Sequence, residues 1–431
     1  QGYSSAASDV YKRQIYMNGV NFMIKQPLKG MNDFIPEEAG LRDYMMGQII
    51  DVYHQFGFER IYTPAIEDIE NINNKEGGDN QKLIFKILKR GEKLEEAIKD
   101  GKLDDLSDMG LRYDLTLPLT RFYANNKANL PQIGKFIQID RVYRAERPQR
   151  GRCREFVQCD IDVIGDESYY AEIELITATG RALLRLPIGE FFIRVNNRQV
   201  LKAVLLSFGF NEEALDNICI ILDKLDKIGV DGVVGELEAQ GYDVKAIGGL
   251  KKLISNPVTL DDIENIIPEN PNLQILKNVI DGANQLSKGS YKVIYDFTLV
   301  RGQGYYTGCV FEIASAKFGG TIGGGGRYDN LIGKFTGEAT PAVGFSIGFE
   351  RIYAILHETG FKVPGRKKLA IIYKNDYIGA FNLADSYRDS YEVSMYAFPK
   401  KVGKLLNRLE LQGFNAYVCL LYTSPSPRDM R

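Results

Sequence analysis

The stretch RVYRAERPQRGRCREFVQCDID, residues 141–162, places six arginines within fourteen positions of a chain whose formal net charge is only −2. Apolar and polar residues alternate on both sides of its centre. The sequence therefore predicts two strands, 135–146 and 154–165, joined by the polar loop 147–153 into a long antiparallel hairpin. Charges of one sign at this density repel one another unless acids or an anionic ligand lie close by.

Strand alternation also predicts which side chains share a face with one of these arginines, Arg144. They are Phe156, Gln158, Asp160 and Asp162. The guanidinium group of arginine matches two phosphate oxygens at once, so this face is suited to a phosphate ligand. The alternative is a solvated hairpin laced with ion pairs, and for an arginine-rich ribbon taken alone we favour that interpretation.

The composition excludes several classes of protein. No apolar run approaches the ~18 residues that a membrane span needs, and the start lacks a signal-peptide plan, so we expect a soluble, cytoplasmic protein with no membrane contact. The sequence contains only two histidines, His54 and His357, which argues against a Ser-His-Asp triad and against a histidine-bound zinc site. The five scattered cysteines suit reduced thiols, and the near-neutral charge opposes a surface coated in basic groups.

The chain of 431 residues is long enough for two or three domains. Helical and strand periodicities predict an α+β protein, in which an antiparallel sheet flanked by helices is interrupted by a helical insertion. The expected divisions are a non-native extension at 1–16, a first part of the main domain at 17–196, a mostly helical insertion at 197–289, a second part at 290–362, a truncated α/β domain at 363–418 and a non-native tail at 419–431. The native start is expected at Met17 or Met23.

Three further stretches have the chemistry to bind a ligand. In 111–122, Asp114 and Thr116 are predicted on one strand face, where they could clamp an ammonium group, although a turn-capping role is equally common. The glycine tract 319–326 lacks the signatures of a Walker loop and of a dinucleotide fold, yet it could line a pocket with bare backbone. Arg351 is predicted just inside a helix N-terminus, which disfavours a cation by ~0.3–1 kcal/mol, so we expect Glu350 or a phosphate to lie beside it.

Together these stretches resemble a class II aminoacyl-tRNA synthetase, specifically the histidyl-tRNA synthetase family, over nearly all of residues 25–418. LKGMNDFIPEE is similar to the family's opening, and FERIYTPAIE, VYRAERPQRGRCREF and GFSIGFERI are similar to its three class-wide motifs. RGQGYYTG and GGGRYDNL resemble its histidine-specific segments, with Gln303-Gly304 where the family commonly has Leu-Asp. The resemblance implies a class II fold, a homodimer formed through the motif around Pro64, and an anticodon-binding role for 363–418.

The resemblance also implies the catalytic residues. Arg144 would grip the α-phosphate of ATP and the carboxylate of histidine, Arg301 would face it across the α-phosphorus, and Arg351 would hold the γ-phosphate. Glu146 would hydrogen-bond the adenine and Phe156 would stack on it. Mg²⁺ would bridge the phosphates, with no metal ligand assigned to the protein.

The implied histidine pocket consists of Asp114, Leu115, Thr116, Gln158, Asp162, Tyr305, Tyr306 and Tyr328. The first group, Asp114, Thr116 and Gln158, would hold the α-ammonium. Asp162 and Tyr306 would read the imidazole, whose one donor and one acceptor suit a carboxylate and a phenol. Tyr305 and Tyr328 would close the wall.

The implied partners are L-histidine, ATP and histidine tRNA, whose acceptor end would meet Gln149, Arg150 and Arg152 at the hairpin tip. The main alternative is the synthetase-like regulatory subunit of ATP phosphoribosyltransferase, which shares the fold without activating histidine. That subunit typically loses the ATP-binding arginines, whereas Arg144, Arg301 and Arg351 are present here. A generic RNA-binding protein would need basic surfaces interleaved with aromatic residues, and this chain has one basic hairpin among acids.

Overall fold

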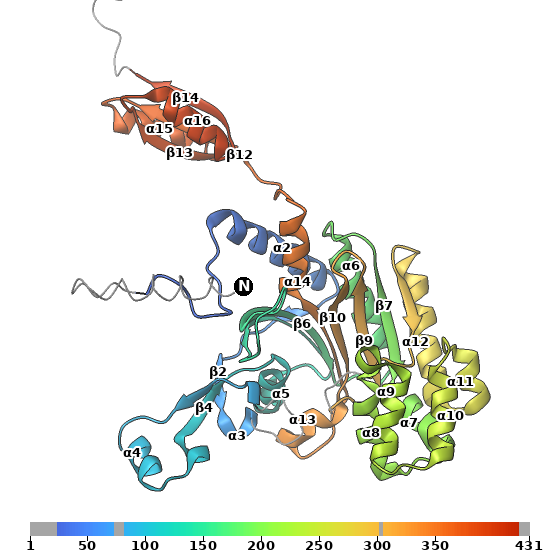
Figure 1. Cartoon of the computed structure of the whole chain (residues 1–431). Helices are drawn as coiled ribbons and strands as arrows, with labels where there is room; N and C mark the ends of the chain where they lie inside the picture. The colour runs from blue at the N-terminus through green and yellow to red at the C-terminus, as the bar shows by residue number, and fades with distance from the viewer. Residues whose placement is uncertain (1–23, 73–81, 301–304, 422–431) are drawn as a thin grey trace, which may run out of the picture. The chain divides into compact units, whose positions relative to one another are not determined.

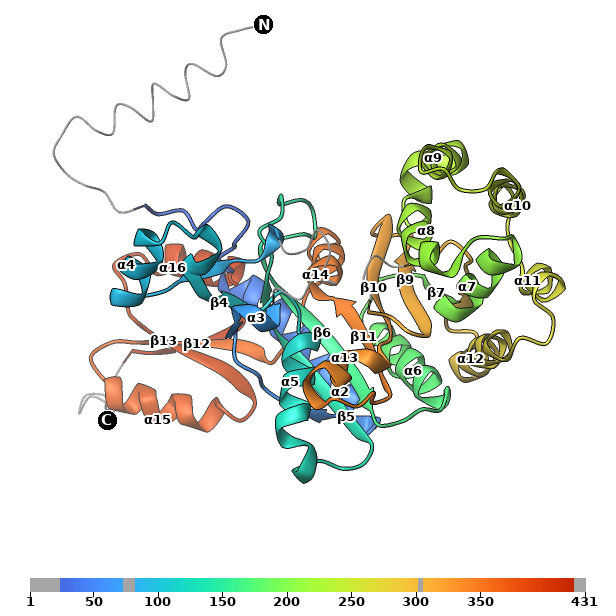
Figure 2. The ribbon, with the colours of Figure 1, turned by 90° about the horizontal axis from the view of Figure 1, so that it is seen from below.

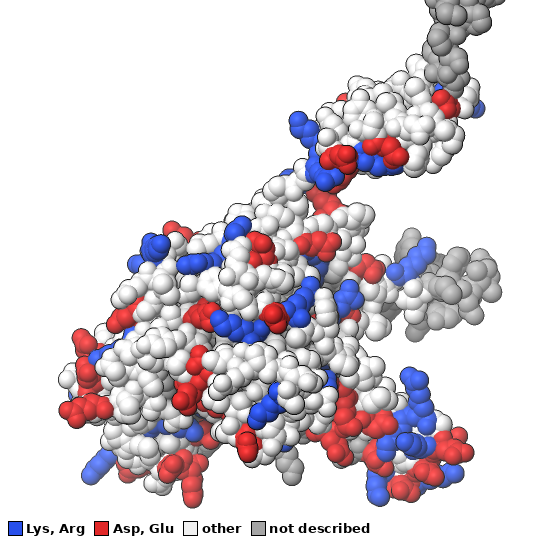
Figure 3. All heavy atoms as spheres, turned by 180° about the vertical axis from the view of Figure 1, so that it is seen from behind, with Lys and Arg blue, Asp and Glu red and all other residues white. Residues whose placement is uncertain are grey.

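The computed structural model describes residues 24–72, 82–300 and 305–421. The chain divides into two compact units, Gln1–Phe361 and Lys362–Arg431. Within the described part, no helix combines the length and the apolar character that crossing a membrane requires. Lysines and arginines are interspersed with aspartates and glutamates over the face of the molecule shown in Figure 3, so charges of both signs share that surface.

An eight-stranded sheet forms the centre of the first unit (Figure 1). Its strands, in spatial order, are β1 (Glu59–Arg60), β5 (Gly134–Tyr143), β6 (Glu155–Ile164), β11 (Ala342–Gly348), β10 (Gly320–Arg327), β9 (Cys309–Ser315), β7 (Phe191–Asn197) and β8 (Lys292–Tyr295). The six central strands pair antiparallel, as predicted, whereas the short edge strands β1 and β8 pair parallel with β5 and β7. β8 ends at Tyr295, because the chain turns after that residue.

The arginine-rich stretch forms the predicted hairpin of β5 and β6, with Val142 opposite Phe156. The odd-numbered residues of β6, from Val157 to Val163, face the hydrophobic core and are at most 7% exposed. The even-numbered residues therefore occupy the other face, because successive side chains of a strand alternate. The periodicity of one strand thus separates the core from a polar surface.

Helices cover the two faces of the sheet differently. On the core face pack α2 (Pro36–Gln55), α6 (Tyr170–Leu184), α12 (Pro271–Ser287) and α14 (Phe349–Glu358) (Figure 1). Pro36 begins α2, where its missing N–H costs nothing, and Gly57, at φ 77°, follows its end. On the opposite side lie α5 (Thr116–Asn126) and α13 (Asp329–Thr336), which pack against each other (Figure 2).

Two smaller parts extend the first unit. The helical insertion follows β7 and consists of α7 (Arg198–Ser207), α8 (Leu215–Leu222), α9 (Leu225–Ala239), α10 (Val244–Ile254) and α11 (Leu260–Ile266), before α12. A three-stranded sheet contains β2 (Ile66–Asp68), β4 (Ser107–Leu111) and β3 (Lys86–Leu88), beside α3 (Ile69–Ile72) and α4 (Glu92–Lys99). β4 ends at Leu111, so the predicted strand face holding Asp114 and Thr116 is wrong. Thr116 instead starts α5, whose first turn accommodates Pro118.

The second unit is a small α/β module with one helix on each face of a parallel sheet. It contains β12 (Lys367–Tyr373), α15 (Tyr377–Tyr387), β13 (Tyr391–Ala397), α16 (Val402–Leu411) and β14 (Phe414–Leu420), with β12 at the centre of the sheet. Leu369 and Ile371 pack with α15, whereas Ala370 and Ile372 pack with α16. This alternation of strands and helices agrees with the α/β class predicted for residues 363–418.

The glycine tract forms strand β10 in the middle of the large sheet. A Cβ atom added at Gly325 would lie 2.0 Å from the carbonyl oxygen of Gly344, and one added at Gly344 would lie 2.0 Å from Oδ1 of Asp162. These glycines let two strands and a carboxylate approach more closely than side chains would allow. Gly323, Gly324, Gly325 and Gly326 also line the pocket described below, so the expected lining of bare backbone is confirmed, and the close approach of the strands requires it.

We predict that Gly325→Ala lowers the free energy of unfolding by ~1–3 kcal/mol, because the new methyl group must displace backbone. Urea denaturation of the purified protein measures this. Gly320→Ala is the matched control on the same strand, since its Cβ would meet only Phe318 at 4.0 Å. Equal stability of the two variants would contradict the close approach described here.

Candidate active site

One cleft on the face of the sheet opposite the core gathers most of the predicted site residues. Those that line it are Asp114, Thr116, Arg144, Glu146, Arg152, Phe156, Gln158, Asp162, Tyr305, Tyr306, Tyr328 and Arg351. Leu115 is buried, at 1% exposure, and is not among the described residues that line the cleft. Arg301 lies outside the described residues, and Gln149 and Arg150 belong to the hairpin tip.

Arg144 is held between two aromatic rings. Its guanidinium carbon lies 4.2 Å from the ring centre of Tyr113 and 5.0 Å from that of Phe156, and its Nε donates to the Tyr113 carbonyl at 3.1 Å. Such cation–π contacts restrict a long side chain before any ligand binds. The predicted position of Arg144 beside Phe156 is confirmed, and the remaining guanidinium donors can serve an anion in the cleft.

Three carboxyl groups line the same cleft, of which Asp160 and Asp162 are buried and Asp114 is partly buried. Burial is the main cause that raises the pKa of each one, to about 7 for Asp162 and well above the ordinary value for Asp160. Tyr328 donates its hydroxyl to Asp162 at 2.6 Å, and Ser346 donates to Asp160. A cationic ligand would offset the unfavourable burial of negative charge in this pocket.

Asp114 also caps the helix that it precedes. Its Oδ1 accepts the N–H of Leu117 at 3.1 Å in the first turn of α5. The sequence left an ammonium clamp and a turn cap as alternatives, and the structure shows the capping bond together with a position in the cleft. A carboxylate has lone pairs enough for both roles.

Sequence reasoning assigned no role to Asp160 or Ser346, although both line the cleft. The side-chain nitrogen of Gln158 lies 3.4 Å from each of them as a donor. This arrangement leaves Oε1 of Gln158 buried and without a hydrogen-bond partner among the described residues. Alternation along β6 already placed Asp160 beside Gln158, and that was the available signal.

Glu350, one of the two anions expected beside Arg351, forms an ion pair with Arg42. Both of its carboxylate oxygens accept from Arg42 on α2, at 2.7 and 2.8 Å, and one also accepts the N–H of Val157 at 3.2 Å. Arg351 donates to the carbonyl of Thr321 and lies 5.7 Å from the ring centre of Phe318. The Arg42–Glu350 pair therefore joins α2, α14 and β6 immediately beside the cleft.

Several arginines of the hairpin form ion pairs, as expected from the alternative interpretation of a solvated, ion-paired hairpin. Arg150 pairs with Glu358 through both nitrogens, at 2.8 and 2.5 Å, and Arg152 lies 3.3 Å from Glu146. Arg141, at the far end of β5, pairs with Glu155 at 3.1 Å. These pairs are partly exposed, so each contributes little to stability and can open to a phosphate at small cost.

The eight-stranded mixed sheet and the helices that flank it have the fold of a class II aminoacyl-tRNA synthetase. The family model described as histidyl-tRNA synthetase matches residues 30–352. The chain belongs to the histidyl-tRNA synthetase family.

Similar proteins agree with this assignment. The chain is 43% identical to a histidine–tRNA ligase of Leifsonia xyli over 77% of this chain and 80% of the relative, and 36% identical to one of Christiangramia forsetii over 77% and 76%. A crystal structure of histidyl-tRNA synthetase from a Nostoc species matches with a TM-score of 0.78 and 27% identity, covering 93% of this chain and 92% of that one.

We predict that Arg42→Ala raises the KM for ATP more than the KM for histidine, because Arg351 lies next to the Glu350 carboxylate that Arg42 holds. The variant should also lose ~3–5 kcal/mol of stability, since a buried carboxylate loses its partner. Arg121→Ala is the control: it removes the same kind of fork from Glu67, at 2.8 and 2.7 Å. An equal rise of both KM values in Arg42→Ala would contradict this placement.

We predict that Asp162→Asn changes how stability depends on pH. The folded pKa of Asp162 is about 7, against ~3.9 in an unfolded chain. The folded state therefore keeps a proton that the unfolded chain releases, so this group makes the free energy of unfolding fall as pH rises from about 4 to about 7. The variant should lose less stability over that window in urea titrations without ligand. Parallel curves for both proteins would refute the raised pKa.

Proposed function

We propose that this protein is a histidine–tRNA ligase, which activates L-histidine with ATP to histidyl-adenylate and transfers it to the 3′ end of histidine tRNA. The observation that carries the proposal is one cleft that is lined by both acidic and basic side chains. Asp114, Asp160 and Asp162 form an acidic pocket, and Arg144 and Arg351 line the same cleft. The acidic pocket suits the ammonium group of an amino acid, and the two arginines suit a triphosphate.

In this proposal the histidine ammonium lies between Asp114, Thr116 and Gln158. The buried Oε1 of Gln158, which has no partner among the described residues, would accept a bond from that ammonium group. Asp162 and Tyr306 would contact the imidazole nitrogens, with Tyr305 and Tyr328 closing the wall. Asp162 already accepts from Tyr328, so its second oxygen would receive the imidazole N–H.

The ATP would lie along the other half of the cleft. Phe156 and Glu146 would hold the adenine, Arg351 the γ-phosphate, and Arg144 with Arg301 the α-phosphate. The histidine carboxylate would then attack the α-phosphorus in line with the departing pyrophosphate. Fixed guanidinium groups stabilise the charge of such a transition state without reorganising, so positioning and electrostatics supply the catalysis.

The remaining assignments are parts of the same proposal. Mg²⁺ would arrive bound to the phosphates of ATP, because the described residues contain no group of three or more histidine, cysteine or acidic side chains placed to hold a metal ion. Gln149, Arg150 and Arg152 would contact the tRNA acceptor end, with the second unit on the anticodon. We further propose a cytoplasmic homodimer that pairs through the segment around Pro64.

The regulatory-subunit alternative has less support. A solved structure titled as an ATP phosphoribosyltransferase regulatory subunit/histidyl-tRNA synthetase from Bacillus halodurans matches with a TM-score of 0.78, but at 22% identity this likeness concerns the fold alone. Arg144 and Arg351, the residues that such a subunit has no need to keep, both line the cleft.

We predict that the protein catalyses histidine-dependent exchange of pyrophosphate into ATP and that Arg144→Ala lowers this exchange at least ~100-fold, the usual effect of removing one transition-state donor. Arg141→Ala, in the same strand but paired with Glu155, should remain within about twofold of wild type. Charging of histidine tRNA by the same preparation tests the second step. Absence of exchange in a folded protein that binds histidine would favour the regulatory subunit.

A further inference from the structure

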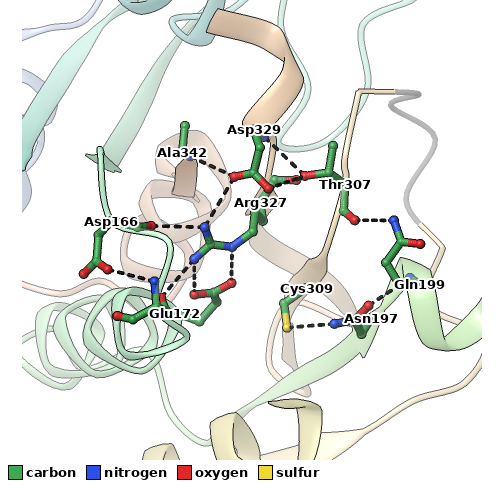
Figure 4. A network of polar contacts seen from close by, with 10 residues as sticks. Asp166, Glu172, Asn197, Gln199, Thr307, Cys309, Arg327, Asp329 and Ala342 are labelled. Atoms are coloured by element: carbon green, nitrogen blue, oxygen red, sulfur yellow. Dashed lines mark hydrogen bonds and ion pairs between the residues drawn. The ribbon is translucent and has the colours of Figure 1, made fainter. Parts of the chain in front are cut away.

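A network of polar contacts joins the two histidine-specific segments next to the predicted imidazole pocket (Figure 4). One segment contributes Thr307, which follows Tyr306 directly. The other contributes Arg327 and Asp329, which flank Tyr328. Neither the resemblance nor the roles proposed above give these three polar residues a function.

Thr307 is bonded on every polar group that it offers. Its N–H donates to the Arg327 carbonyl at 2.8 Å. Its hydroxyl donates to Oδ2 of Asp329 at 3.0 Å and accepts the N–H of Asp329 at 3.2 Å. Its carbonyl accepts from Gln199 at the start of α7, at 2.8 Å. The hydroxyl is thus donor and acceptor at once, which an isosteric valine cannot reproduce.

Asp329 and Arg327 connect this network of polar contacts to the rest of the sheet. Oδ1 of Asp329 accepts the N–H of Ala342 on β11 at 2.9 Å and lies 3.3 Å from Arg327. Arg327 forms a fork with Glu172 of α6, with both bonds at 2.6 Å, and Glu172 is only 2% exposed. Two parallel charge-assisted bonds fix the orientation of a guanidinium group more tightly than one would.

These contacts constrain the two neighbouring tyrosines, Tyr306 and Tyr328. Tyr328 is held on both sides in sequence, while its hydroxyl donates to Asp162 and its N–H donates to Ala342 at 2.7 Å. The ring of Tyr306 lies against Gly326, where an added Cβ would come within 2.8 Å of it. Both rings are at most 7% exposed. The positions of both tyrosine rings therefore depend on the backbone that Thr307, Arg327 and Asp329 hold in place.

We propose that Thr307, Asp329 and Arg327, braced by Glu172, are positioning residues that fix Tyr306 and Tyr328 for imidazole recognition and so set the affinity for histidine without affecting that for ATP. The proposal rests on the proposed function, because it assigns a role in the same pocket. The network contacts the pocket through backbone and neighbouring residues, and Arg351 and Phe156, proposed for ATP, come from other strands and helices.

The test is steady-state pyrophosphate exchange by the full chain, with histidine and ATP varied separately. Thr307→Val should raise the KM for histidine about tenfold, since it loses two hydrogen bonds of modest net value, and should leave the KM for ATP within twofold. Thr307→Ser keeps the hydroxyl and should restore the wild-type KM for histidine. Asp329→Asn should also raise that KM selectively, because the bond from Arg327 loses its charge.

Thr177→Val provides a control for the loss of a buried threonine hydroxyl. Its hydroxyl bonds the Ile173 carbonyl within α6, at 2.7 Å, on the helix that carries Glu172. This variant should leave both KM values unchanged, although its stability can fall. Comparable rises of both KM values in Thr307→Val, or failure of Thr307→Ser to rescue, would overturn the proposal. Histidine-independent or absent exchange by the wild type would instead overturn the proposed function.

Discussion

The burial of Asp160 and Asp162 on one face of the sheet, close to the partly buried Asp114, is the constraint on which the rest of the site depends. Asp114, Asp160 and Asp162 lose most of their hydration, which raises the pKa of each. Gly344 is needed because the carboxylate of Asp162 occupies the space of its side chain, and Gly325 is needed because the carbonyl of Gly344 does the same. Burying these carboxyl groups lowers the stability of the fold, and the pocket that results favours a cation.

Two arginines line the same cleft as these acids. Arg144 is fixed between rings, and Arg351 follows a glutamate that Arg42 holds from another helix. In the function we propose, phosphate charge and ammonium charge each bind to groups of opposite sign within one cleft. Such preorganisation explains why a site without a side-chain nucleophile can activate an amino acid, because the bound reactants supply the reacting groups.

Local patterns in the sequence predicted what one strand or helix decides by itself. Alternation along residues 154–165 predicted the second strand of the hairpin and the face on which Asp162 lies. The strand expected around Asp114 was wrong because Pro118 and the capping carboxylate favour a helix start.

Contacts between distant segments were beyond such patterns. Arg42 and Glu350 lie 308 positions apart, and Arg327 and Glu172 lie 155 apart, so no spacing rule connects them. Both pairs depend on how the sheet brings its covering helices together. The residues that support the site were therefore missed, whereas many of the residues that line it were found.

The most direct test of the central claim is mass-spectrometric detection of the adenylate formed by the purified protein with ATP and one amino acid at a time. The acidic pocket and the paired arginines predict histidyl-adenylate from histidine and no adenylate from the other amino acids. A protein that binds histidine and ATP together yet forms no adenylate would contradict the account. Adenylates formed equally well from several amino acids would contradict its histidine specificity.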